Sequence, residues 1–143
     1  MTSSTAPRVV PFGDASSPAA AEAWELALDL FFESWRVSNG WPPADARSFR
    51  QRALTLSRLV GVAALTRCAV IVEIHLSSAR QSLVDLEGEL GRLLKSGLAT
   101  RPSVETWVSW STRLGIALAR WRGEARSARA HTNVERNRPQ ADS

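Results

Sequence analysis

An unbroken apolar repeat from Val62 to Leu93 constrains the fold of this chain more than any other feature. Its steps alternate between three and four residues, which places every member on one stripe of an α-helix. The ten members are Val62, Leu65, Ala69, Val72, Leu76, Ala79, Leu83, Leu86, Leu90 and Leu93. This heptad pattern is typical of a helix that packs lengthwise against another helix, as in a coiled coil.

A second apolar stripe occupies the N-terminal half of the same segment. It includes Phe49, Leu56 and Val60, and Arg67 interrupts it. No proline occurs between Asp45 and Ser96, so the pattern favours one central helix over 45–96, about 52 residues long, with two partner helices. A kink near Gly61 or at 77–78 would divide this segment and produce a four-helix bundle.

Two shorter amphipathic segments flank the central one. The first runs from Ala19 to about Val37 and ends at "SNGWPPAD", where a glycine and two prolines stop a helix. The second begins near Ser103, a residue type that caps helices, and runs to about Ala130. We therefore predict an all-α antiparallel helical bundle with a long central helix and a coiled-coil-like hairpin. It has three helices, or four if the central helix kinks.

The ends of the chain differ from this middle part. Residues 1–18 are rich in Ser, Ala, Pro and Thr, and this composition predicts a disordered N-terminal segment. Residues 19–130 are predicted to form the bundle domain. Residues 131–143 are polar and include two arginines, and we predict a disordered basic tail there.

The last predicted helix contains three tryptophans, which could serve either to stack on bases or to fill a core. At about 100° per residue, Trp107, Trp110 and Trp121 lie within roughly 60° of one another and share that arc with Leu114 and Leu118. Rings that stack on bases must be exposed. The shared arc instead predicts that at least two of the tryptophans are buried.

Positive charge gathers towards the C-terminus. The formal net charge is +4, and residues 101–143 contain eight arginines and four acidic residues. We expect only two acids, Glu124 and Glu135, to lie near the end of the last helix, so this end should form a positive patch that contributes little to stability. Its arginines are candidate contacts for nucleic acid or a protein partner: Arg122, Arg126, Arg129, Arg136 and Arg138.

A degenerate helix-turn-helix motif at 56–70 is the other sequence feature that suggests DNA binding. Gly61 follows the small residue Ser57 by four positions, and a turn between two such helices often contains glycine. The motif also needs an apolar residue near position 67, where this chain has Arg67. The uninterrupted heptad that begins at Val62 favours a continuous helix instead.

Signatures of catalysis, cofactors and membrane insertion are scarce. The chain has no Gly-rich phosphate loop, no paired-histidine zinc motif and no Cys-x-x-Cys, so we predict no catalytic residue, cofactor or metal. Cys68 is the only cysteine and the N-terminus does not resemble a secretory signal, which together favour a cytoplasmic protein. The most apolar window, 59–76, contains Arg67 and Glu73, so a membrane span is not expected.

These patterns favour a non-enzymatic protein-interaction or assembly protein. We expect it to self-associate as a homodimer through apolar surface at Val70, Ile71 and Ile74, and to bind a further protein partner. The alternative is a small DNA-binding regulator that uses the basic C-terminal helix end or the degenerate motif. An enzyme that uses an acid such as Glu73 is the least favoured hypothesis.

Overall fold

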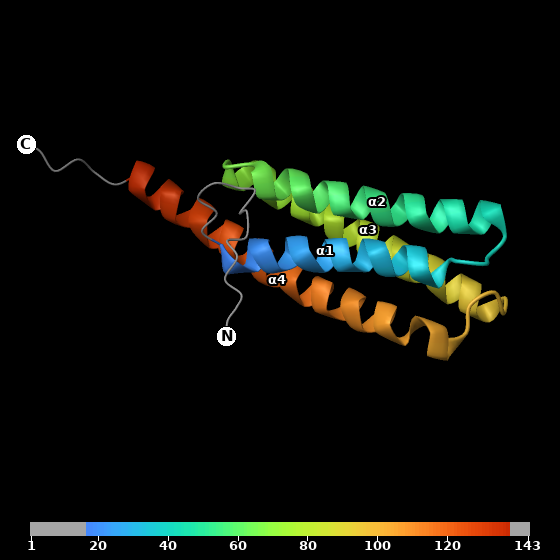
Figure 1. Cartoon of the computed structure of the whole chain (residues 1–143). Helices are drawn as coiled ribbons and strands as arrows, with labels where there is room; N and C mark the ends of the chain where they lie inside the picture. The colour runs from blue at the N-terminus through green and yellow to red at the C-terminus, as the bar shows by residue number, and fades with distance from the viewer. Residues whose placement is uncertain (1–16, 138–143) are drawn as a thin grey trace, which may run out of the picture.

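Four helices form an antiparallel bundle in the computed structural model, which describes residues 17–137 (Figure 1). The helices are α1 (Pro18–Val37), α2 (Pro43–Leu65), α3 (Ala69–Lys95) and α4 (Arg101–Arg136). Each helix packs against two neighbours, in the order α1, α2, α3, α4 and back to α1. The predicted all-α bundle is confirmed, in its four-helix form.

Short connections join the helices, and their residues explain where each helix stops. The α1–α2 connection contains Gly40, whose φ of +89° suits glycine because it has no Cβ. Gly97 has a φ of +85° after α3 and has the same role. At the start of α1, the Oγ of Ser17 accepts a hydrogen bond of 3.0 Å from the amide of Ala20. The N-cap of α4 is Thr100 and not Ser103.

The predicted long helix over 45–96 is wrong, because residues 66–68 separate α2 from α3. A straight helix of about 52 residues would be about 78 Å long, whereas the 20 residues of α1 span only about 30 Å. Such a helix would need α1 to cover one half and α4 the other, so that its two apolar stripes would not share one core. Folding back at 66–68 places both apolar stripes against one core. The break has neither glycine nor proline, and Thr66 simply leaves the helix with an extended backbone (ψ of 136°).

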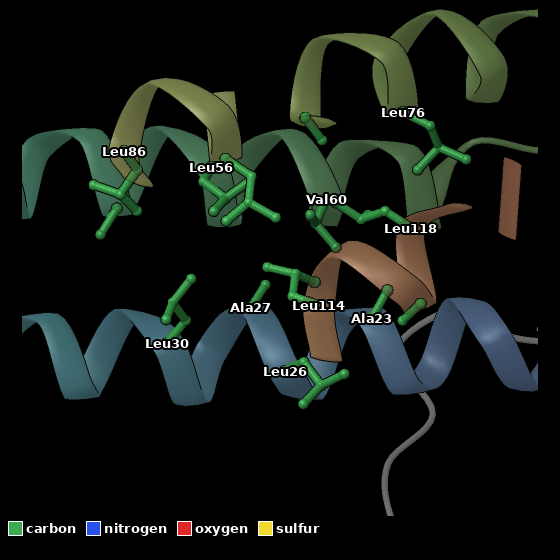
Figure 2. Packing of buried hydrophobic residues seen from close by; sticks show 14 of the residues in the cluster. Ala23, Leu26, Ala27, Leu30, Leu56, Val60, Leu76, Leu86, Leu114 and Leu118 are labelled. Atoms are coloured by element: carbon green, nitrogen blue, oxygen red, sulfur yellow. The ribbon is translucent and has the colours of Figure 1, made fainter. Parts of the chain in front are cut away.

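The division of this segment also changes which residues of the heptad repeat are buried. Val62 and Leu65 are exposed, whereas the repeat is buried from Val72 onwards. The seam residues behave as predicted, with Leu83, Leu86 and Leu90 at most 4% exposed. Figure 2 shows the layer in which side chains of all four helices meet. The labelled residues are Ala23, Leu26, Ala27, Leu30, Leu56, Val60, Leu76, Leu86, Leu114 and Leu118.

The tryptophans of α4 belong to the core. Trp107 is 1% exposed and Trp121 is 5% exposed, while Trp110 is partly buried. The prediction that at least two of them are buried is confirmed. These two rings therefore fill space between helices, where no base can reach them.

Gly61 lies inside α2 and forms no turn. Its open side is filled by the ring of Trp24 in α1, and an added Cβ would lie 2.8 Å from Trp24 Cζ3. The turn that the degenerate helix-turn-helix motif required at Gly61 is therefore absent, because this glycine serves close packing between α1 and α2. The helices on either side of the actual turn at 66–68 run antiparallel (Figure 1).

Helix α4 ends later than the sequence predicted. We expected it to stop near Ala130, but it continues to Arg136 and projects beyond the other three helices (Figure 1). The predicted tail therefore begins with helical residues. Ser17 and Pro18, which were predicted to be disordered, instead cap and begin α1. The rest of the predicted N-terminal segment, up to residue 16, and Arg138 lie outside the described residues.

Candidate interaction surfaces

An apolar surface covers the end of the bundle where α2 turns into α3. We call it the turn patch, and its side chains are between 43% and 65% exposed. Its members are Val62, Leu65, Val70, Ile71 and Ile74. The three residues proposed from the sequence for self-association all lie in this patch. Val62 and Leu65 were missed because the heptad placed them in the core seam.

The local helix geometry explains why the turn patch faces outward. Val72 and Leu76 point into the core, so positions 70, 71 and 74 lie on the opposite side of α3. From Val70 to Ser78 the exposed positions of α3 are three branched apolar residues and two serines. This face has no exposed charged side chain, which distinguishes it from an ordinary solvated helix surface.

At the end of α4 the predicted positive patch surrounds an acid that comes from another helix. Arg126 Nε donates a hydrogen bond of 2.9 Å to Glu73 Oε1, and Arg129 Nη1 lies 3.0 Å from Glu73 Oε2. Glu73 belongs to α3 and its side chain is only 13% exposed. The expectation that only Glu124 and Glu135 lie near these arginines is therefore wrong, since residues far apart in sequence meet at this end.

The electrostatics of this cluster hold Glu73 in its charged form. The hydrogen bond from Arg126 lowers the pKa of the Glu73 carboxyl, and the charges of Arg129 and Arg122 lower it further, although partial burial acts in the opposite direction. Among the described residues, the buried Nε of Arg122 has no hydrogen-bond partner. The three guanidinium groups exceed the single carboxylate by two charges, and Arg136 lies exposed further along α4.

A pocket with aromatic walls lies at the opposite end of the bundle, between the end of α1 and the start of α2. Its volume is about 570 Å³, and Trp35, Trp41, Arg47 and Arg50 are among its lining residues. The guanidinium carbon of Arg50 lies 4.0 Å from the centre of the Trp35 ring. The Nε of Arg50 donates a hydrogen bond of 2.7 Å to Ser38 Oγ.

Sequence reasoning did not identify this α1–α2 pocket. Trp35 belongs to the apolar stripe of the first predicted helix, yet its side chain is 48% exposed. A usable signal was the sequence "SWRVSNGWPPADARSFR", in which two tryptophans flank a helix stop and arginines follow within one or two turns. The pocket becomes visible only when the connection at 38–42 folds α2 back on α1.

No family model, characterised protein or solved structure matches the chain. Within residues 17–137, no group of three or more His, Cys, Asp or Glu side chains is arranged to hold a metal ion. Over the same residues, no helix combines the length and apolar character needed to cross a membrane. Any functional inference therefore rests on the turn patch, the basic end of α4 and the α1–α2 pocket.

Proposed function

We propose that this protein is a non-enzymatic assembly module that self-associates through the turn patch. The observation that carries the proposal is the exposure of five branched apolar side chains on the two helices that meet at the turn at 66–68. Removing such side chains from water provides about 25 cal/mol per Å² of buried apolar surface. Exposed apolar side chains gathered around one turn of a fold are typical of interaction sites.

The occupant that fits this patch best is a second copy of the chain. The outward face of α3 from Val70 to Ser78 has no exposed charge, so two copies related by a two-fold axis can pair through this face while the exposed Arg67 of the turn stays at the rim. An uncharged surface also provides no electrostatic selection for a strongly acidic or basic partner. The patch would form the centre of the interface, and the rest of α2 and α3 would form its rim.

The test is sedimentation equilibrium at micromolar concentration. We expect a species of twice the chain mass of 15.6 kDa. Ile74→Asp places a charge at the centre of the proposed interface and should give a monomer with unchanged helix content. Val84→Asp is the matched control, because Val84 is 58% exposed on the same helix but lies outside the turn patch. A monomeric native protein, or equal loss of the dimer in both variants, would refute the proposal.

Nucleic-acid binding at the end of α4 is the second candidate. The observation that favours it is the excess of guanidinium groups over carboxylates around Glu73, together with the exposed Arg136. Such a surface would contact phosphates without reading sequence. Retention on DNA or RNA columns at about 50 mM salt, falling steeply as salt rises, is the expected result. A native protein that is not retained at this salt concentration excludes the second candidate without affecting the first.

A further inference from the structure

The α1–α2 pocket differs from two other hollows of the described bundle in its charge. A hollow of about 520 Å³ near the turn at 66–68 is lined by Arg67 and Glu124, one charge of each sign. A hollow of about 450 Å³ between α2 and α3 is lined by Arg52 and Asp85, again one of each. The α1–α2 pocket is lined by Arg47 and Arg50 and has no acidic residue in its wall.

The positive charge in this pocket is fixed in place without being neutralised. Arg50 is half-buried. Its Nε donates a hydrogen bond to Ser38 Oγ, and its guanidinium group lies over the Trp35 ring. Ser38 is itself fixed, because its hydroxyl donates a hydrogen bond of 2.7 Å to the carbonyl of Ser34. Among the residues that the structure describes, none provides a carboxylate to Arg47 or Arg50. Two guanidinium groups with open terminal nitrogens are therefore available to an anion, in the planar geometry that suits phosphate.

The aromatic walls indicate what else the ligand contains. Trp35 is 48% exposed, and the rings of Phe31 and Trp41 also line the pocket. Exposed aromatic rings and guanidinium planes are the surfaces on which nucleic-acid bases stack. A volume of about 570 Å³ lies within the range typical of small-molecule sites. Because Arg50 already lies over the Trp35 ring, a base would stack on the part of that ring that stays exposed. An acidic peptide would use the arginines but would leave this part of the ring in water.

We infer that the α1–α2 pocket binds a nucleotide, with the base stacked against Trp35 and the phosphate held by Arg47 and Arg50. The nucleotide comes either as a free molecule or as part of a single strand, since the base and phosphate chemistry is shared. This site lies at the opposite end of the bundle from the turn patch, so it is independent of the proposed self-association. It is also separate from the arginines around Glu73.

Isothermal titration calorimetry with four probes tests this inference: AMP, adenosine, inorganic phosphate, and a single-stranded deoxyadenosine oligonucleotide of about eight residues. We expect AMP to bind about tenfold or more tightly than adenosine or phosphate, because only AMP engages both halves of the site. An oligonucleotide that binds about tenfold more tightly than AMP would assign the site to single strands. Equal affinities for the two would assign it to free nucleotides.

Variants connect the affinity to the pocket. Arg47→Gln should weaken AMP binding about tenfold and leave the fold intact, because Arg47 is exposed. Trp35→Ala should weaken it by a similar factor of about ten. Arg58→Gln is the control, since Arg58 is an exposed arginine of the same helix outside the pocket wall. Arg50→Gln is less suitable because Arg50 also holds Ser38.

Three outcomes would overturn the inference. In the first, AMP binds no more tightly than adenosine, so that the arginines do not recognise phosphate. In the second, Arg58→Gln weakens binding as much as Arg47→Gln, so that the effect comes from overall charge. In the third, an acidic peptide without aromatic residues binds more tightly than AMP, which would assign the pocket to a protein ligand.

Discussion

The indole Nε1 of Trp107 in α4 donates a hydrogen bond of 2.8 Å to the Oγ of Ser34 in α1, and both side chains are buried. The Ser34 hydroxyl in turn donates to the carbonyl of Leu30 at 2.7 Å. Trp107 also packs against Phe49 of α2, with ring centroids 5.6 Å apart. One tryptophan therefore links three helices, and its polar atom is satisfied inside an apolar core.

Replacement of Trp107 by Phe should destabilise the bundle by about 1–3 kcal/mol through the lost hydrogen bond, and the smaller ring should add a packing loss. Urea unfolding followed by circular dichroism measures the change. Trp110→Phe is the control, because Trp110 is only partly buried. Equal destabilisation by the two changes would show that the hydrogen bond from Trp107 to Ser34 does not contribute to the free energy of unfolding.

The core seam provides a second prediction. Leu86 is fully buried between helices, so Leu86→Ala should lower the free energy of unfolding by about 2–5 kcal/mol. Val84→Ala, two residues away and 58% exposed, should change it by no more than about 0.5 kcal/mol. A Leu86→Ala variant as stable as the Val84→Ala variant would contradict the packing of α3.

Replacing Gly61 with alanine tests the packing of α1 against α2. Helix propensity alone predicts that this change stabilises the protein, whereas the packing predicts the opposite. Alanine is the better helix former by about 1 kcal/mol, but a Cβ at Gly61 would meet Trp24 Cζ3 at 2.8 Å. We expect Gly61→Ala to destabilise the protein by about 1–3 kcal/mol through overpacking.

Gly88→Ala is the matched control for this change. Gly88 is a helical glycine of α3, and an added Cβ there meets nothing within 4 Å. Gly88→Ala should therefore stabilise the protein by about 0.5–1 kcal/mol. Thermal melts of the two variants should therefore shift in opposite directions, and stabilisation by both would mean that Trp24 does not press against α2.

Glu73 makes the stability of the α4 extension depend on pH. Its carboxyl pKa is lowered in the folded state, so its contribution is present above the unfolded pKa of about 4.5 and is lost as the pH falls through the lower folded value. Glu73→Gln should therefore increase amide hydrogen exchange in the last turns of α4 at neutral pH. The difference from the native protein should shrink as the pH falls below about 4.5.

The control for Glu73 is Glu105→Gln, an exposed acid near the start of the same helix. It should leave exchange at the end of α4 unchanged at every pH. The arginines of this cluster are expected to contribute to the stability of the α4 extension in the same way. The sequence alone predicted that this positive patch contributes little to stability, but replacing Arg122, Arg126 and Arg129 with Gln would leave Glu73 without its partners. A pH-independent effect of Glu73→Gln would show that the ion pairs do not hold α4.

The sequence by itself determined the fold class, the ends of α1 and the burial of the α3 and α4 seams. These features depend on local periodicity and on helix-stopping residues such as Gly40, and each signal lies within one or two helical turns. The burial of Leu83, Leu86, Leu90 and Leu114, and of Trp107 and Trp121, could be predicted because an apolar stripe must face a core wherever its partner lies.

The tertiary structure decided the turn at 66–68, the exposure of the turn patch, the partner of the C-terminal arginines and the α1–α2 pocket. Thr66, Arg67 and Cys68 have no strong preference for a turn, so the break follows from tertiary packing, in which folding back places both apolar stripes against one core. Glu73 meets Arg126 across 53 positions of sequence, and Arg50 meets Trp35 only after α2 folds back on α1. Contacts of this kind depend on how helices pair in space, and periodicity along one chain segment contains no information about that pairing.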